Sequence, residues 1–408
     1  MSVEVHIEWA GETRLVGRIH TAPRSPAVTF EYVPEWLGRA DTFAIDPTSL
    51  PLRSGSHHSP ALFGAMQDCG PDRWGRRLID RAVRKQILKN RAYQDLDYVL
   101  ALDDFSRIGA LRFRVDEDSP FLASGHGNIP PVIQLAALLN AADAVHGDTE
   151  TAKDLRYLLD QGSPLGGARP KSAIGLPDGQ LAIAKFPKPD DPRDIAAGEI
   201  LALTLAQQAG ITVAGHRLVD VKGHAVSVIT RFDRDGTRRI PFLSANSLLG
   251  LSHDQSGTYT MLADGIRQFG HDTAADLREM WRRLVFSLLA SNYDDHLRNH
   301  GFLMRAPGRW ALSPAYDLNP VPEIERTQTP MTAITEYQED PTIAAALDAA
   351  PRFGLKSAEA KQILREVLVA VADWRKVGKQ LRLKAATLDA YATAFAHPLL
   401  EEAGSLLR

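Results

Sequence analysis

The stretch NYDDHLRN, residues 292–299, follows directly after a segment that has the apolar spacing of a helix. That segment, 273–290, repeats apolar side chains along one helical face, so the polar stretch lies in the loop after the helix. Four residues separate Asp294 from Asn299. This is the D-x-x-x-x-N spacing of kinase catalytic loops, where the aspartate orients the substrate hydroxyl and the asparagine binds Mg²⁺. The alternative is a helix C-terminal turn with solvated acidic side chains.

A further aspartate follows at a distance that suits the same chemistry. Asp317 lies in LSPAYDL, eighteen residues after Asn299, in an apolar and strand-like setting. A carboxylate among apolar neighbours costs free energy unless a cation or several donors face it. We therefore expect Asp317 to bind the metal ion. The alternative is a core aspartate that accepts hydrogen bonds from loop N–H groups.

Upstream, the predicted strand LAIAKF places a lysine where nucleotide phosphates could bind. Lys185 alternates with Leu181 and Ile183 on one face of this strand. Glu199 follows fourteen residues later, inside an otherwise apolar helix, where a carboxylate could hold the lysine in position. A solvated lysine beside a surface glutamate is the alternative.

A glycine-rich segment, GSPLGGARPK at residues 162–171, precedes that strand. Glycine lets a backbone approach a phosphate and aim its N–H groups at it. No Gly-Lys-Ser/Thr follows, so this is not a Walker A loop, and a surface loop between a helix and a strand is the alternative. The order of glycine loop, lysine, glutamate, Asp…Asn and aspartate is the set of parts that phosphoryl transfer needs.

The composition excludes several classes of protein. Of the 408 residues, 44% are hydrophobic and 24% are charged, which excludes disordered, collagenous and coiled-coil chains. The net charge of −3 gives no general attraction to nucleic acid or anionic membranes. The single cysteine, Cys69, permits no internal disulfide and no cysteine metal cluster. We see no signal peptide or apolar span, and we expect a cytoplasmic protein.

The pattern predicts an α+β protein in three parts. Residues 1–130 alternate in the manner of short strands and end at a Gly/Pro-rich boundary. Residues 131–240 are strand-rich and contain a hairpin turn at 177–179. Residues 241–408 are mostly helical. A strand-rich half followed by a helical half predicts two lobes with a cleft between them.

Together these motifs resemble those of the HipA family of bacterial serine/threonine kinase toxins. The C-terminal part contains GGARPK, AIAKFP, RFDR, NYDDHLRNHGFL and LSPAYDL, and the N-terminal part contains FEYVPEWL, PLRSGSH, CGPDRWGRRLIDR and DDFSRIGALRF. The resemblance covers most of the chain. It implies a small N-terminal α+β domain followed by a bilobal, protein-kinase-like domain that binds ATP and Mg²⁺ in its cleft.

The resemblance also implies roles for individual residues. Asp294 would be the catalytic aspartate, Asn299 and Asp317 would bind Mg²⁺, and Lys185 would contact the ATP phosphates. The other implied cofactor-binding residues are Leu165, Gly166, Gly167, Ala168, Arg169 and Lys171 in the phosphate-side loop, Glu199, the hinge beside the adenine at Thr230, Arg231 and Phe232, and finally His296 and Tyr316.

Members of the family autophosphorylate a serine in the glycine-rich loop, which ejects the loop and inactivates the enzyme. Ser163 is the matching position here. Between this serine and the lysine, the loop is one residue longer here than in the shorter form of the family. Pro164 also follows Ser163 directly. Ser172 is therefore a second candidate.

The resemblance implies a protein substrate, for which an aminoacyl-tRNA synthetase is the family analogy, and a HipB-like DNA-binding antitoxin as partner. DNA would be reached only through that partner, and we interpret the basic residues at 375–384 as a solvated helix face. No membrane partner is expected.

Two other functions stay open. One is a small-molecule kinase of the aminoglycoside or choline type, which the N-terminal domain and the glycine-rich loop disfavour. The other is a non-catalytic corepressor that binds an antitoxin, which the intact Lys185, Asp294, Asn299 and Asp317 disfavour. His296 and His300 have a zinc-binding spacing for a helix, but their position in a loop argues against zinc.

Overall fold

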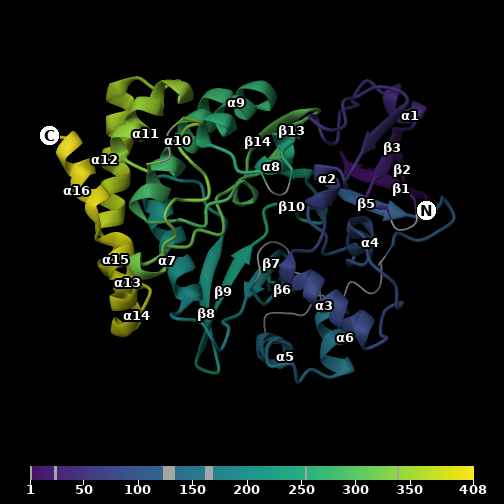
Figure 1. The fold of residues 1–408 in the computed structure, drawn as a ribbon, viewed down its shortest axis with the longest axis horizontal. Helices are drawn as coiled ribbons and strands as arrows, with labels where there is room; N and C mark the ends of the chain where they lie inside the picture. Colours follow the sequence, from purple (N-terminus) through teal and green to yellow (C-terminus); the bar gives the residue numbers. More distant parts are fainter. Residues whose placement is uncertain (1, 23–24, 123–133, 161–168, 253–254, 338–339) are drawn as a thin grey trace. The chain divides into compact units, whose positions relative to one another are not determined.

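A computed structural model describes residues 2–22, 25–122, 134–160, 169–252, 255–337 and 340–408. They form two compact units (Figure 1). The first unit comprises residues 1–190 and 219–243, and the second comprises 191–218 and 244–408. The three predicted parts divide the chain at other positions, and their boundaries stay a prediction.

The first unit contains a five-stranded sheet in the order β4-β3-β2-β1-β5. Its strands are β1 (Ser2–Trp9), β2 (Glu12–Thr21), β3 (Val28–Tyr32), β4 (Ser56–Ser59) and β5 (Leu111–Arg114). Alternation in β1 predicts a half-buried strand, but Glu4 and His6 are buried as well as Val3 and Val5. On this face Phe121 packs edge-on against the His6 ring at a centroid distance of 5.4 Å, and Glu4 pairs with Arg18 and Arg114.

A four-stranded sheet in the order β6-β7-β9-β8 follows. Its strands are β6 (Lys171–Gly175), β7 (Leu181–Lys185), β8 (His216–Val221) and β9 (His224–Thr230). The predicted hairpin at 177–179 joins β6 to β7, with Gly179 at φ +83°. A second hairpin, β10 (Arg234–Asp235) and β11 (Arg238–Arg239), comes after β9.

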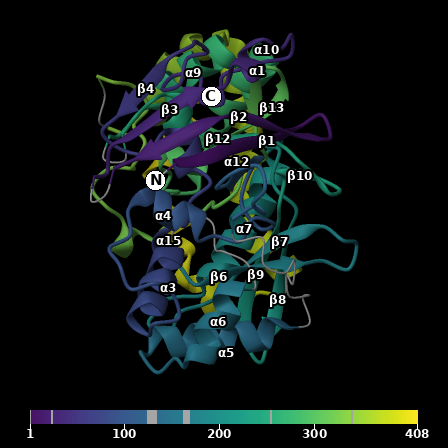
Figure 2. The same ribbon diagram turned by 90° about the vertical axis from the view of Figure 1, so that its right-hand side faces the viewer.

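Helices of the first unit gather at the four-stranded sheet (Figure 2). They are α3 (Arg73–Arg84), α5 (Leu135–His146) and α6 (Ala152–Asp160), and their buried side chains form one core with those of β6, β7 and β9. Trp74 is part of this core, and its indole N–H donates to the carbonyl of Lys171. The short helices are α1 (Pro34–Leu37), α2 (Gly64–Gln67) and α4 (Asp95–Leu100).

The second unit is mainly helical, as the pattern predicts. Its longer helices are α7 (Ile195–Gln208), α9 (Tyr259–Phe269), α10 (Thr273–Leu289), α11 (Ile343–Ala349), α12 (Ser357–Ala372), α13 (Trp374–Gln380) and α16 (Pro398–Leu406). The shorter ones are α8 (Ala245–Leu248), α14 (Ala385–Ala390), α15 (Ala392–Phe395) and the 3₁₀ turns at Leu297–Asn299, Glu323–Glu325 and Ala350–Phe353. Two antiparallel strands, β13 (Gly301–Ala306) and β14 (Arg309–Leu312), lie among these helices, and β12 (Phe242–Ser244) leads the chain into the unit.

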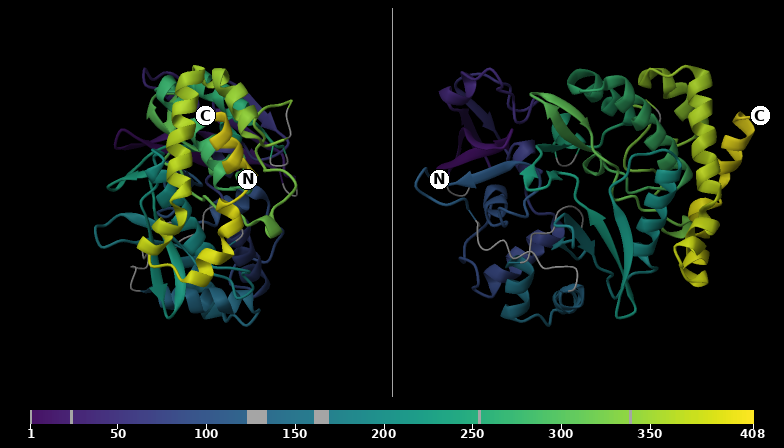
Figure 3. Two further views of the ribbon diagram at one scale, coloured as in Figure 1. Left: turned by 90° about the vertical axis from the view of Figure 1, so that its left-hand side faces the viewer. Right: turned by 180° about the vertical axis from the view of Figure 1, so that it is seen from behind.

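The C-terminal helices, drawn from yellow-green to yellow, line one side of this unit (Figure 3). The apolar spacing of residues 384–395 predicts one helix, but the structure has two, α14 and α15, with Tyr391 between them. This tyrosine packs against α7, where its hydroxyl donates to the carbonyl of Asp194 at 2.9 Å and Gly198 leaves room for its ring. Within the described ranges, no helix has both the length and the apolar character that a membrane crossing requires.

Candidate active site

The loop that follows α10 holds two of the predicted catalytic residues. Helix α10 ends at Leu289, and Ser291 adopts a left-handed conformation with φ +53°, which turns the chain out of the helix. The Asp294 side chain is exposed, whereas Asn299 is buried at 7% exposure. The Asn299 Nδ2 donates to the carbonyl of Asp294 at 3.1 Å, so the loop is closed by its own side chain.

A second loop, after β14, carries Asp317. The sequence predicts a strand-like setting, but Asp317 adopts a left-handed conformation with φ +56°. Aspartate tolerates this conformation because its short polar side chain can bond locally, and Asn319 Nδ2 donates to its Oδ1 at 3.1 Å. The backbone thereby turns sharply at the predicted metal ligand.

Hydrogen bonds join these two loops. The Tyr316 hydroxyl donates to the carbonyl of Arg298 at 2.7 Å. The Asn319 N–H donates to Asn292 Oδ1 at 3.0 Å. Two loops on either side of the β13–β14 hairpin therefore hold Asp294, Asn299 and Asp317 in one part of the second unit.

The donor set of these loops suits Mg²⁺. Among the described residues there is no group of three or more His, Cys, Asp or Glu side chains placed to hold a metal. Mg²⁺ does not require one, because it is commonly bound by one or two carboxylates together with substrate phosphates and water. Asn299 uses Nδ2 inside the loop, so Oδ1 is the atom with which it could bind a metal ion, and Asp317 has a carboxylate that could do the same.

The neighbouring Asp295 has a role that the sequence does not reveal. Its carboxylate is 2% exposed and accepts hydrogen bonds from the Tyr259 hydroxyl and from Ser287 Oγ at 3.1 Å. His300 Nε2 lies 3.3 Å from its other oxygen. Burial alone would raise the pKa of Asp295, but His300 and these hydrogen bonds outweigh burial and lower it. Adjacent acidic residues give no sequence signal for which of them is buried.

His300 thus serves this carboxylate. The segment from 296 to 300 also lacks the α-helix that a zinc-binding H-x-x-x-H pair would need, since only a 3₁₀ turn spans Leu297–Asn299. His296 is half-buried at the start of that turn, and its Nδ1 is buried. Both observations agree with the prediction against zinc.

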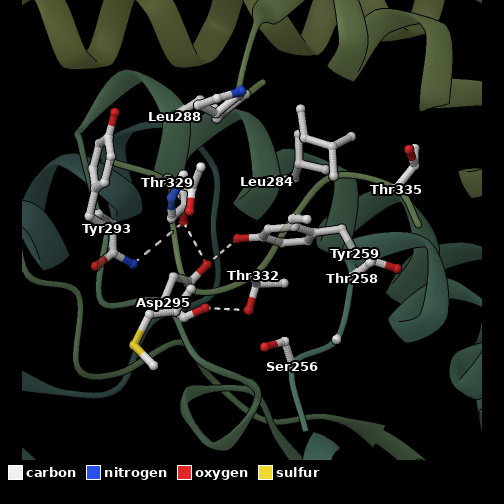
Figure 4. Close-up of a pocket in the computed structure, with 18 of the residues that line it drawn as sticks. Ser256, Thr258, Tyr259, Leu284, Leu288, Tyr293, Asp295, Thr329, Thr332 and Thr335 are labelled. Atoms are coloured by element: carbon white, nitrogen blue, oxygen red, sulfur yellow. Dashed lines mark hydrogen bonds between the residues drawn. The ribbon is translucent and has the colours of Figure 1, made fainter. Parts of the chain in front are cut away.

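A cavity of about 480 Å³ lies beside the loop, entirely within the second unit (Figure 4). Tyr259 and Thr332 point toward Asp295 in its wall, and the Thr332 hydroxyl donates to the backbone carbonyl of Asp295. Other walls come from α10 and from residues 328–336, which follow the Asp317 loop. Hydroxyl groups line much of it, from Ser256, Thr258, Tyr259, Ser287, Tyr293, Thr329, Thr332 and Thr335.

In the first unit, two lysines sit opposite each other on neighbouring strands. Lys171 of β6 pairs in register with Lys185 of β7. Lys171 is 3% exposed, and its Nζ lies 3.0 Å from Asp72, the N-cap of α3. Burial raises the pKa of Asp72, and the Lys171 ammonium offsets part of that rise. The Lys171 side chain is therefore engaged by Asp72, a contact that the sequence did not predict, while Lys185 is half-buried at the strand end.

Part of the predicted phosphate-side loop lies outside the described residues, namely Ser163, Leu165, Gly166, Gly167 and Ala168. Arg169, which follows them, is half-buried. Ser172, the alternative autophosphorylation candidate, is 1% exposed in β6, and its hydroxyl donates to the carbonyl of Ala173 at 3.2 Å. A buried and bonded hydroxyl disfavours Ser172.

The remaining predicted residues are in regular structure or next to it. Glu199 is 2% exposed in α7 of the second unit, which rules out the surface-glutamate alternative. Thr230 pairs with Ala182 at the end of β9, and the Arg231 N–H donates to the carbonyl of Leu181. Phe232 is half-buried and packs against the ring of Phe242 at a centroid distance of 6.3 Å.

Two protein-family models match this chain. Residues 163–375 match the model of the HipA-like C-terminal domain, which spans more than half of the chain. The chain belongs to the HipA family. Residues 9–114 match the HipA N-terminal domain, which covers most of the five-stranded sheet. The predicted family is confirmed.

Two relatives that match part of the chain are both named as candidate kinases. A Haemophilus influenzae protein named as a candidate kinase is 27% identical over 189 residues, which cover 40% of this chain and 55% of the relative. The candidate kinase Y4dM of Sinorhizobium fredii is 33% identical over 153 residues, which cover 33% of this chain and 36% of the relative. The matched region thus spans about half or less of these relatives.

A solved HipA structure matches over nearly the full length. It is the Shewanella oneidensis toxin–antitoxin system of HipA, HipB and operator DNA, with a TM-score of 0.70 and 17% identity, covering 99% of this chain and 97% of that chain. At this identity the likeness shows the fold. The predicted mixed α+β architecture, with an N-terminal sheet domain and a kinase-like part, is confirmed.

Proposed function

We propose that this chain is an ATP- and Mg²⁺-dependent kinase that phosphorylates a serine or threonine hydroxyl of a protein. The observation that carries the proposal is the pair of hydrogen-bonded loops in the second unit. They expose the Asp294 carboxylate and hold Asn299 and Asp317, an amide and a carboxylate, as a two-residue ligand set. Phosphoryl transfer depends mainly on such positioning and charge stabilisation.

In this proposal each residue acts through its chemistry. Asp294 would orient the acceptor hydroxyl and take its proton as the hydroxyl oxygen bonds to the γ-phosphorus of ATP and the bond from that phosphorus to ADP breaks. Asn299 Oδ1 and the Asp317 carboxylate would hold a Mg²⁺ ion, which when bound would neutralise phosphate charge. Lys185, at the end of β7, would pair with phosphate oxygens, and Thr230, Arg231 and Phe232 would border the adenine, as the family resemblance implies. The hydrogen bond inside the loop fixes the positions of Asp294 and Asn299 relative to each other, so the loop needs little reorganisation during the reaction.

The cavity beside the loop supports a polypeptide acceptor. Tyr293 and Asp295, the neighbours of Asp294 on either side, both line it. Its volume and its hydroxyl-rich wall would accommodate one large side chain next to the reacting hydroxyl. Glu336, which is exposed, lies on its rim. An acceptor chain bound here would pass Asp294.

The likeness to the HipA family also supports proposals for the partner of this chain and for its regulation. The Shewanella protein was solved together with HipB and operator DNA, which supports a DNA-binding antitoxin partner for this chain. Autophosphorylation is proposed at Ser163, because the Ser172 hydroxyl is buried.

The test is a labelling assay on the full chain with γ-labelled ATP and Mg²⁺. We expect label on the protein, located at Ser163 by mass spectrometry, and loss of label in Asp294→Asn. Asp348→Asn is the matched control, because Asp348 is an exposed aspartate on α11 of the same unit. Labelling that persists in Asp294→Asn, or that appears on aminoglycosides or choline instead of protein, would contradict the proposal.

A further inference from the structure

The motif RFDR, residues 231–234, contains two residues of the segment proposed to border the adenine, and it contacts the motif DDFSRIG in the first unit. Residues 231–234 leave β9 and run toward the five-stranded sheet (Figure 1). Residues 103–109 lie in the connection between α4 and β5. The side chains of Arg231 and Arg234 donate to the backbone carbonyls of Phe105, Ser106, Arg107 and Gly109.

Asp233 holds the two arginines in place. It is 1% exposed, and its Oδ1 accepts from Arg231 Nε at 2.8 Å. Its Oδ2 accepts from Arg231, from Arg234 Nη1 at 2.6 Å and from the N–H of Gly109 at 2.7 Å. Burial alone would raise the pKa of Asp233, but the two arginines hold it well below its usual range. The carboxylate is therefore charged and saturated with donors.

This arrangement fixes the backbone on both sides of Arg231. The Arg231 N–H ends the ladder between β9 and β7 by donating to the Leu181 carbonyl at 2.8 Å, while its guanidinium binds the 106–107 carbonyls. Phe232 is held between these anchors. Segment 230–232 is the stretch that would border the adenine in the proposed function.

We propose that Arg231 and Asp233 are positioning residues: through loop 105–109 they set the backbone of segment 230–232, and with it the affinity for ATP and the preference for adenine over guanine. The inference rests on the proposed function, since it assigns that segment to the nucleotide base. Loop 105–109, from the N-terminal part of the chain, would then affect nucleotide recognition through its contacts with Arg231.

The chemistry of the contact favours arginine and aspartate at these positions. A guanidinium presents planar, paired donors, so one side chain can bind Asp233 on one edge and two carbonyls on the other. Lysine has a single ammonium and cannot reproduce this geometry. A shift of segment 230–232 would change hydrogen bonds to the base edge, where adenine and guanine differ, more than it would change the distant phosphate chemistry.

Kinetics on the full chain test the proposal, with Arg231→Lys and Asp233→Asn as variants. We expect the KM for ATP to rise about tenfold and the ratio of kcat/KM for ATP over GTP to fall about tenfold, while kcat changes less than threefold. Arg238→Ala is the matched control, because Arg238 is an exposed arginine that pairs with Asp235 in the next hairpin. The control should keep both values.

A merely structural contact would lower the unfolding temperature without changing the ATP-to-GTP ratio, so folded variants with an unchanged ratio overturn the proposal. If neither variant folds, hydrogen exchange on the wild-type chain decides. ATP with Mg²⁺ should slow exchange in both 230–234 and 105–109, and protection that leaves out 105–109 overturns the proposal. A wild-type chain that neither binds nor uses ATP overturns the proposed function, and the inference with it.

Discussion

Adjacent aspartates in the candidate catalytic loop should respond in opposite ways to the same substitution. Asp294 is exposed, and Asp295 is buried beneath it with Tyr259, Ser287 and His300 around its carboxylate. Asp294→Asn should therefore abolish phosphorylation while leaving the fold intact. Asp295→Asn should instead destabilise the second unit and spare part of the activity.

The magnitude follows from the contacts of each carboxylate. Removing one member of a buried, hydrogen-bonded charge pair costs about 3–5 kcal/mol, and exposed substitutions usually stay within about 0.5 kcal/mol. An asparagine at 295 keeps one acceptor oxygen but places an NH₂ group against a hydroxyl or His300. We expect a loss of about 3 kcal/mol, which lowers the unfolding temperature of a unit of this size by about 6–12 °C.

Thermal unfolding and labelling are measured on wild type and on both variants, with labelling at 20 °C, where Asp295→Asn remains folded. Tyr259→Phe adds a check, because it removes a hydroxyl donor to Asp295 and should cost less than Asp295→Asn. The reasoning fails if Asp295→Asn unfolds at the wild-type temperature, or if Asp294→Asn is the destabilised variant.

Three further predictions concern a hydrogen bond, an ion pair and a buried carboxylate. Tyr316→Phe removes the 2.7 Å hydrogen bond to the Arg298 carbonyl and should lower the free energy of unfolding by about 1 kcal/mol. If this bond sets the spacing of the two loops, a Mg²⁺ titration of the phosphorylation rate should show weaker Mg²⁺ binding in the variant. A wild-type titration curve would count against that link. Lys171→Met leaves Asp72 buried without its cation and should destabilise the first unit by about 3 kcal/mol in urea unfolding; adding Asp72→Asn, which still caps the helix, should restore most of the loss, and an uncorrected double variant would argue against the ion pair. Burial raises the pKa of Asp46 to about 6, above its unfolded value, so its proton stabilises the folded state at low pH and that stabilisation is lost as pH rises through 6. The free energy of unfolding of wild type relative to Asp46→Asn should then fall by about 3 kcal/mol between pH 3.5 and pH 7, and a flat or rising difference would contradict the assignment.

Local patterns predicted much of the secondary structure correctly. The helices predicted around Glu199 and over 273–290 are α7 and α10, and the side chains of Asp194 and Asp272 cap them. The loop at 292–299 was expected because apolar helical spacing stops before it. The spacing of residues 384–395 predicts a continuous helix, and this prediction is wrong at Tyr391. The tyrosine packs against α7, a distant segment, and no local sequence signal marks the break.

By itself, the sequence determined the order and spacing of the candidate site residues, the hairpin that presents Lys185, and membership of the HipA family. These depend on side chains near one another along the chain or on motifs read directly. Only the tertiary structure decided that Asp295 and not Asp294 is buried, that Lys171 is paired with Asp72, and that Arg231 binds the backbone of residues 106–107. The physical reason is that burial and ion pairing are set by packing between distant segments, and no periodicity within one segment records which distant segment will cover it.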